Sequence, residues 1–134
     1  MNIRQRGPAV HIWRIAFQDL EMRTTSSDGV HVWIAQEYVI AALSIPDPIY
    51  ALRTLATGDQ ATLTLGKNGL DDEEGQDSLP MIDEVAIYEL MVRFPTRSSA
   101  VFKPWLLRLR HYFFELAASA YKNDEVESDV VTLQ

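Results

Sequence analysis

Residues 105–120 read WLLRLRHYFFELAASA, and no other stretch of the chain is as periodic. Apolar side chains recur there every three or four residues over about four turns, as they do on one face of an α-helix. The members of this stripe are Trp105, Leu106, Leu109, Tyr112, Phe113, Leu116, Ala117 and Ala120. The stretch therefore predicts a long amphipathic helix whose aromatic face lies in the core.

A proline interrupts the pattern just before this stretch. Ser98 and Ser99 can cap a helix, and Pro104 follows at a position where it would remove a backbone hydrogen bond. We therefore expect a kink or a new helix start at Pro104, with a short helix before it.

The first 34 residues have strand periodicity instead. Within residues 9–18, Trp13, Ile15 and Phe17 share one face, and residues 22–25 form a second candidate strand. The sequence SSDG at residues 26–29 is typical of a turn. Residues 30–34 then predict a third strand, with Val30, Val32 and Ile34 on one face and His31 and Trp33 on the other.

Two short helices follow this β-element. Residues 35–43 carry an apolar stripe (Tyr38, Val39, Ala42, Leu43), and the helix must end before Pro46. Asp47 and Pro48 are an N-cap and a first helical residue, and they start a second helix that Gly58 closes, with Ile49, Leu52 and Leu55 as its apolar side. The pair resembles a DNA-reading helix-turn-helix, but its second helix has a single basic residue, Arg53, so packing onto a sheet is our preferred interpretation.

The middle of the chain predicts a β-hairpin and a further helix. Residues 60–65 alternate apolar and polar, and residues 79–82 can return as their partner strand. Asp83 can cap the next helix, whose stripe is Ile87, Leu90, Met91 and Phe94 and which Pro95 ends. The fold class is therefore α+β, with small antiparallel β-hairpins packed with four to five short helices and a longer C-terminal amphipathic helix. One domain at 9–121 would follow an N-terminal arm at 1–8 and precede an acidic, flexible tail at 122–134.

Composition excludes several functional classes. The chain has 134 residues and no cysteine, so disulfides, cysteine-ligated zinc and thiol chemistry are excluded. No apolar run is long enough to span a membrane, and no apolar segment follows the basic residues near Met1. We expect a cytoplasmic protein that makes no membrane contact.

The sequence offers few groups for catalysis. Its three histidines, His11, His31 and His111, lie far apart, and none has a metal-ligand spacing. The segment GKNG at residues 66–69 is too short for a phosphate-binding loop. The adjacent carboxylates Asp83 and Glu84 would do acid–base chemistry only if they were buried together, and a helix cap explains them more simply. We expect no enzyme, no metal and no cofactor.

Charge is unevenly distributed along the chain. The formal net charge is −7, but the acidic residues concentrate in residues 71–77 and 124–129. We interpret residues 71–77 as a solvated hairpin tip, since the spacing of their carboxylates lacks the ligand pattern of a calcium-binding loop. Between residues 90 and 114 there is no acid, and the basic residues are Arg93, Arg97, Lys103, Arg108 and Arg110. Seven- and eleven-residue spacings place Lys103 with Arg110, and Arg97 with Arg108, on related helix faces. Such a surface can contact phosphates or an acidic protein, or it can simply be solvated.

The order of these motifs resembles the N-terminal domain of the BRO family, which baculovirus BRO proteins share with many phage and prophage antirepressors. The run GVHVWIA at residues 29–35 and the helix end AAL at residues 41–43 are similar to family motifs. So are MIDEVAIYEL at residues 81–90 and SAVFKPWL at residues 99–106, and the resemblance covers residues 10–115. A segment RLRH at residues 108–111 departs from the usual family ending.

This resemblance implies nucleic-acid binding or interference with a repressor. Our leading hypothesis is a phage- or prophage-type transcriptional regulatory module that binds DNA, a repressor protein or both, with phosphate contacts from Arg93, Arg97, Lys103, Arg108 and Arg110. The alternative is an acidic protein-binding inhibitor, either a nucleic-acid mimic or an antirepressor without DNA affinity, that acts through Asp71, Asp72, Glu73, Glu74 and Asp77. A homodimer with Trp33 or Phe114 at its interface is a further expectation.

Overall fold

The computed structural model describes residues 12–26, 28–55, 58, 60–64, 78–119 and 130–133. The predicted N-terminal arm at 1–8, the acidic loop at 71–77 and residues 122–129 of the predicted tail lie outside these residues. Ten elements are described: β1 (Trp13–Phe17), β2 (Leu20–Thr25), β3 (Trp33–Ala35), α1 (Gln36–Leu43), α2 (Pro48–Arg53), β4 (Gln60–Thr64), β5 (Ser78–Asp83), α3 (Glu84–Arg93), α4 (Arg97–Ser119) and β6 (Val131–Thr132).

All six described strands belong to one sheet, in the order β4-β5-β3-β2-β1-β6. The hairpins β1–β2 and β4–β5 are antiparallel, as predicted, and β3 joins them by pairing with both β2 and β5. Ile15 and Met22 lie opposite each other and are fully buried, so the predicted apolar face of β1 packs against the core. The α+β class is confirmed, and the separate hairpins of the sequence analysis form a single sheet.

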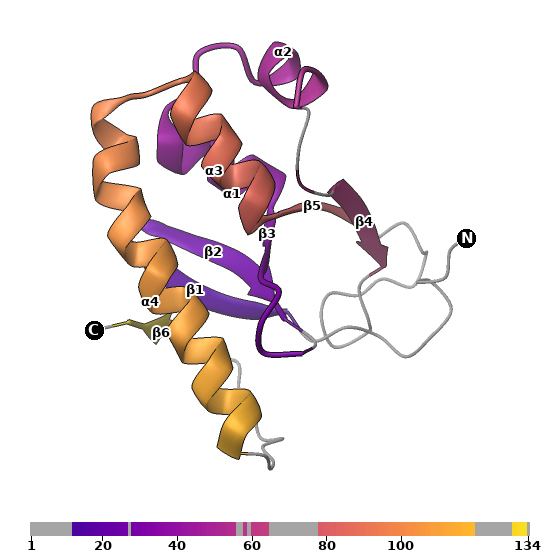
Figure 1. The fold of residues 1–134 in the computed structure, drawn as a ribbon, viewed down its shortest axis with the longest axis vertical. Coiled ribbons are helices and arrows are strands. Elements are labelled where there is room, and N and C mark those ends of the chain that lie inside the picture. The colour runs from indigo at the N-terminus through magenta and orange to yellow at the C-terminus, as the bar shows by residue number, and fades with distance from the viewer. Residues whose placement is uncertain are drawn as a thin grey trace.

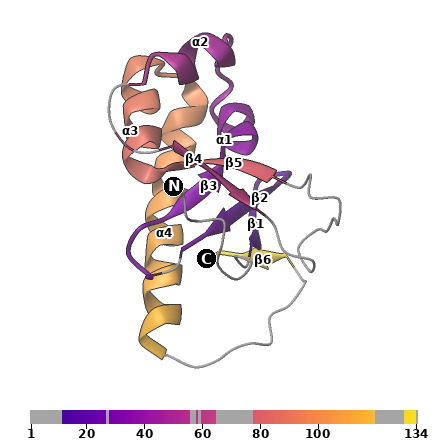
Figure 2. The same ribbon diagram turned by 90° about the vertical axis from the view of Figure 1, so that its right-hand side faces the viewer.

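Helices α1, α2 and α3 group at one end of the molecule, while α4 runs past them alongside β1 and β2 (Figures 1 and 2). Aromatic contacts fix α4 on the sheet. The Trp105 indole Nε1 donates to the carbonyl oxygen of Ala16 at 2.7 Å, and Phe17 meets Phe102 edge-on at 5.1 Å between ring centroids. Four members of the predicted stripe are buried in the core: Trp105, Leu106, Leu109 and Phe113. Tyr112 and Leu116 are partly buried, Ala117 is exposed, and Ala120 lies outside the described residues.

Helix caps follow the local sequence at two of the predicted starts. The Asp47 side chain accepts the backbone N–H of Tyr50 at 3.2 Å, and the Asp83 side chain accepts that of Ala86 at 3.0 Å. Helix α4 begins earlier than predicted, because Thr96 accepts the N–H of Ser99 at 3.1 Å while its own N–H donates to the Ser99 hydroxyl. This reciprocal pair is a capping box, with serine in place of the usual glutamate.

The new helix start predicted as one alternative at Pro104 is wrong, because α4 is continuous from Arg97 to Ser119 with Pro104 inside it. Pro104 and Ala100 are both exposed, so the carbonyl that loses its partner faces solvent, where water can bond to it. On the opposite side, Phe102 and Trp105 are buried and hold both halves of the helix against the sheet. The short helix expected before Pro104 is therefore the first part of α4.

Three further expectations need correction. Val30 and His31, predicted as strand, form bends because Asp28 accepts their backbone N–H groups, and the strand starts at Trp33. Helix α2 ends at Arg53, and Ile49, expected on its apolar side, is 70% exposed. Ala51 is the residue of α2 that packs inward.

The C-terminal tail was predicted to be flexible, and this prediction is wrong for the tail residues that the structure describes. Val131 and Thr132 form β6, which pairs in parallel with Ile15 and Ala16 of β1. Val131 and Leu133 are partly buried against the main core, so apolar contacts hold this strand in place.

Candidate functional site

The five basic residues predicted to contact phosphates are all exposed. Arg93 is the last residue of α3, and the other four lie on α4. Two of them have intramolecular roles. Arg93 Nη1 donates to the carbonyl oxygen of Thr54 at 2.6 Å and to Glu89 Oε2 at 3.2 Å, which ties the end of α2 to α3. Arg110 Nε lies 3.0 Å from Glu84 Oε2. These two side chains therefore contribute to the fold.

The remaining three side chains are Arg97, Lys103 and Arg108. Within the described part of the chain, no ion pair or hydrogen bond joins them to another residue. Because α4 is continuous, the eleven-residue spacing keeps Arg97 and Arg108 on one side of the helix, and Lys103 lies toward the other side. In the part of the chain that the structure describes, these three cations thus have no partner, and their exposure lets an external ligand reach them.

Apolar side chains lie between these cations. Leu107 is 47% exposed and Phe114 is 56% exposed, and their seven-residue spacing places both along the outward midline of α4. Phe114 was predicted only as a possible dimer contact, and Leu107 was not singled out, because both residues lie outside the apolar stripe that identifies the helix in the sequence. Trp33, the other proposed dimer residue, is half-buried and stacks on His31 at 4.9 Å between ring centroids.

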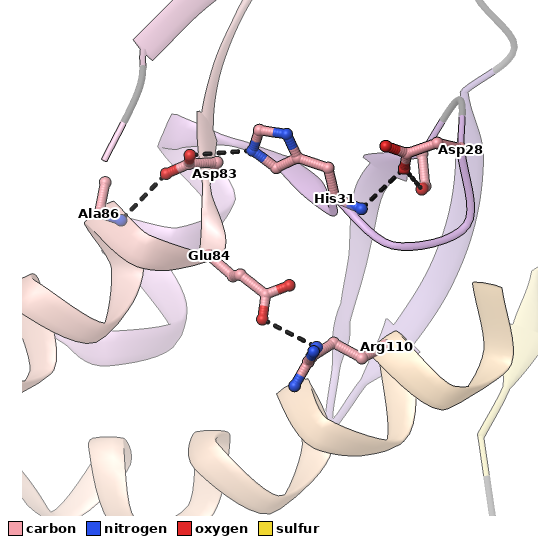
Figure 3. Close-up of polar contacts among 7 residues, drawn as sticks. Asp28, His31, Asp83, Glu84, Ala86 and Arg110 are labelled. Carbon is pink, nitrogen blue, oxygen red and sulfur yellow. Dashed lines mark hydrogen bonds and ion pairs between the residues drawn. The ribbon is translucent and has the colours of Figure 1, made fainter. Parts of the chain in front are cut away.

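A second polar group joins residues that are far apart in the sequence (Figure 3). His31 Nε2 lies 3.0 Å from Asp83 Oδ2, and the next residue, Glu84, pairs with Arg110 of α4. Asp83 and Glu84 are both buried, at 2% and 9% exposure. The sequence analysis predicted the cap at Asp83 but no histidine–carboxylate contact, since no local spacing links His31 to a residue 52 positions away.

The loop before β3 positions His31 in this cluster. Asp28 Oδ1 accepts the backbone N–H groups of Val30 at 2.9 Å and His31 at 2.7 Å, and these bonds hold the pKa of Asp28 below its ordinary value. Gly29 adopts φ +79° and lies directly against Ala117 of α4, so a side chain has no room there. The loop is therefore closed on α4 by a turn that requires glycine.

Glu84 is the least compensated member of the cluster. Its buried Oε1 atom has no hydrogen-bond partner among the described residues, while Oε2 faces Arg110. Burial raises the pKa of Glu84, an effect that Arg110 and His31 oppose and Asp83 reinforces. Burial also raises the pKa of Tyr88, and the charge of Glu84 adds to that rise.

Chemically, this cluster joins three elements. It holds an imidazole against a buried carboxylate, but among the described residues no group of three potential ligands is arranged to hold a metal ion. His31 anchors the β3 loop to the start of α3, and Arg110 anchors α4 to the same point. We therefore take the cluster as structural and the outward face of α4 as the candidate binding surface.

Comparison of the chain with protein-family models, curated proteins and solved structures gives no match. The resemblance to the BRO family therefore stays a prediction from the motifs quoted above. None of the described helices is both long and apolar enough to cross a membrane.

Proposed function

We propose that this protein is a transcriptional regulatory module of the phage or prophage type, which binds duplex DNA through phosphate contacts from the outward face of α4 in the cytoplasm of a bacterial host. The observation that carries the proposal is the set of three exposed cations, Arg97, Lys103 and Arg108, that have no partner among the described residues. Phosphate contacts position a protein on a duplex, and exposed lysine and arginine supply most of them.

The arrangement of these cations suits a backbone more than a single anion. Arg97 and Arg108 are separated by roughly 16 Å along the helix axis, which corresponds to about five base pairs of rise. The net charge of −7 is unevenly distributed along the sequence, since five of the nineteen acidic residues lie within 71–77 and four more within 124–129. Arg93 and Arg110, which were also predicted from the sequence to contact phosphates, are exposed as well, but each already has a partner within the fold.

The test is a titration of labelled duplex DNA at several salt concentrations between about 50 and 200 mM. Each lost phosphate contact reduces the slope of log K against log salt by about 0.9, so Lys103→Ala/Arg108→Ala is expected to flatten it by roughly 2. The control is Arg14→Ala/Arg53→Ala, which makes the same charge change on β1 and α2. Equal slopes for both double variants would show that DNA is held by overall charge, and loss of binding in the control alone would point to the helix-turn-helix interpretation.

The exposed leucine and phenylalanine favour a second candidate function, binding to a regulatory protein such as a repressor. Phosphate contacts need no apolar side chain, whereas contiguous exposed apolar groups with a polar rim are typical of protein interfaces. The alternative from the sequence is an acidic inhibitor that binds its partner protein through residues outside the described part of the chain: Asp71, Asp72, Glu73, Glu74 and Asp77. Reversing those charges to lysine is expected to abolish partner binding if that alternative holds, and to spare or strengthen DNA binding if it does not.

A further inference from the structure

The outward face of α4 carries a regular stripe of small and apolar side chains. Its members are spaced alternately by four and three residues, which is the heptad spacing of helices that pack side by side. The C-terminal end of α4 extends past the strands in both views, so a second helix has room to approach it (Figures 1 and 2). The six members of this stripe are all exposed: Ala100, Pro104, Leu107, His111, Phe114 and Ala118.

One flank of the stripe carries a base and an acid. Arg108 and Glu115 lie on the same side of α4, because seven residues are close to two full turns. Among the described residues no ion pair joins them, and Glu115 lies 3.5 Å from His111 instead. A groove of about 400 Å³ opens along this flank, with Leu107 and Tyr112 of α4 on one side of it and Leu133, after β6, on the other. This flank is therefore concave and balanced in charge.

The partner that such a flank fits has an acid opposite the base and a base opposite the acid. A second copy of α4 presents this order when it runs in the opposite direction. If the two-fold axis passes midway between His111 and Phe114, Arg108 of each copy lies beside the partner's Glu115. The same surface of both copies then forms the contact, so the charge pair occurs twice.

The stripe fits the same register. Phe114 lies opposite the partner's His111, and Leu107 lies opposite the partner's Ala118, so a large side chain meets a smaller one at each level. On the other flank, Arg110 lies opposite the partner's Ala117, and no like charges meet there.

Other arrangements of the two faces bring like charges together. Parallel helices place Lys103 beside the partner's Arg108. Antiparallel helices with the axis midway between Leu107 and His111 place Arg108 against the partner's Arg108 and Arg110 against the partner's Arg110. Juxtaposed like charges are unfavourable at an interface, so charge selects one orientation and one register.

We propose that this protein forms a homodimer by antiparallel packing of α4 on α4 of a second copy, with Phe114 and Leu107 in the contact and ion pairs between Arg108 and the partner's Glu115. The overlap from 107 to 118 spans only about 16 Å, so we expect a weak dimer with a dissociation constant of roughly 10–100 µM. Of the two residues predicted at a dimer interface, this contact uses Phe114 and not Trp33.

Sedimentation equilibrium of the full chain without DNA, from about 5 to 500 µM, measures the dimer. Phe114→Ala is expected to weaken it about tenfold or more, because the largest apolar contact occurs twice. Val92→Ala is the control, since Val92 is 78% exposed on α3, and it should change nothing. A chain that stays monomeric at the highest concentration, or an equal loss in the control, would overturn the proposal and leave the stripe to a partner of another sequence.

A charge exchange tests the register. Arg108→Glu and Glu115→Arg are each expected to weaken the dimer about three- to tenfold, because each places like charges side by side twice. The double variant Arg108→Glu/Glu115→Arg keeps the net charge of the parent and should restore its affinity. Arg53→Glu, on α2, is the control for charge reversal. A double variant as weak as the single ones would overturn the proposed register.

The orientation is measured with a spin label on Ala100→Cys, since the chain has no cysteine of its own. Ala100 lies on the stripe but outside the overlap. The proposed dimer separates the two labelled positions by roughly 38 Å, whereas parallel helices bring them to roughly 10 Å and the other antiparallel register to roughly 28 Å. A distance near either shorter value would overturn the proposed arrangement.

The dimer also affects DNA binding, because Arg108 cannot pair with the partner's Glu115 and contact a phosphate at once. This competition rests on the DNA-binding function proposed above, whereas the dimer does not. At a protein concentration equal to the dimer dissociation constant, Phe114→Ala should raise the apparent DNA affinity roughly twofold, and an unchanged affinity would reject the competition. A dimer without DNA affinity would keep the dimer and reject the DNA proposal, and DNA binding by a chain that stays monomeric would do the reverse.

Discussion

At the scale of single residues, Glu84 is a buried carboxylate of which one oxygen, Oε2, is paired with Arg110, while Oε1 has no hydrogen-bond partner among the described residues. Burial raises the pKa of its carboxyl group above the ordinary value for glutamate. The folded chain therefore binds this proton more tightly than the unfolded chain does. The resulting stability is complete below the unfolded pKa and is lost as the pH rises through the folded pKa.

Glu84→Gln removes this charge and keeps the shape of the side chain. We expect the variant to match the parent near pH 4 and to be more stable by about 1 kcal/mol at pH 8, since an isosteric neutral group avoids the cost of burying a carboxylate. Urea denaturation across this pH range measures the difference. Arg110→Gln is the counterpart: it leaves Glu84 without its cation and should destabilise the chain at pH 8. Greater stability of the parent than of Glu84→Gln at pH 8 would contradict this account.

Gly29 is the second residue at which a small change has a large expected effect. A Cβ atom there would overlap Ala117 and approach the carbonyl oxygen of Phe113 to 3.2 Å, and φ is +79°. Gly29→Ala is therefore expected to lower the free energy of unfolding by about 1–3 kcal/mol, measured by thermal or urea unfolding. The control is Val30→Ala in the same loop, where the side chain is 60% exposed and the cost should be small. Equal effects of the two changes would argue against close packing of this loop on α4.

At the scale of elements, the start of α4 depends on one threonine. The Thr96 hydroxyl accepts the N–H of Ser99 and donates to the carbonyl oxygen of Leu43 at 2.9 Å, so it links α4 to the end of α1. Thr96→Ala should lower the free energy of unfolding by about 1–2 kcal/mol. Thr96→Ser should lower it by much less, because serine keeps the hydroxyl. Unfolding in urea provides the comparison, and a serine variant as unstable as the alanine variant would rule out the hydroxyl as the cause.

The elements also show which parts of the fold a single sequence predicts. Helices α1 and α3, the β1–β2 and β4–β5 hairpins and the caps at Asp47 and Asp83 follow from local periodicity and side-chain chemistry, and all are present. The continuity of α4 through Pro104 depends on tertiary packing of Phe102 and Trp105, which no local rule contains. The exposure of Ile49 has the same origin, since the sequence does not say how deeply α2 docks.

At the scale of the whole molecule, β6 closes one edge of the sheet with two residues. Val131→Asp is expected to release it, because a carboxylate replaces an apolar contact with the core. Amide hydrogen exchange in β1 should then accelerate more than in β3 and β5, with a loss of about 1–2 kcal/mol in global stability. Thr132→Asp, at an exposed position of the same strand, is the control. Unchanged exchange in β1 would show that β6 contributes nothing to this edge.

The candidate site was predictable only in part, for a reason at this same scale. Clustering of basic residues on the last helix is visible in the sequence, and their exposure is confirmed. Which cations stay free is not visible, because the partners of Arg93 and Arg110 come from Thr54 and Glu84, on other segments of the fold. The groove beside Leu107 likewise requires Leu133, which reaches α4 only through the pairing of β6 with β1.

That pairing has a consequence for the order in which the molecule is built. A ribosome makes β1 early and β6 only after all of α4, so the outer edge of β1 has no partner strand during most of synthesis. Loop closure between such distant segments comes late in folding, after the local hairpins. An unpaired edge is a template for strand addition by other chains. Nascent chains are therefore expected to be most prone to association, and most dependent on chaperones, before Val131 emerges.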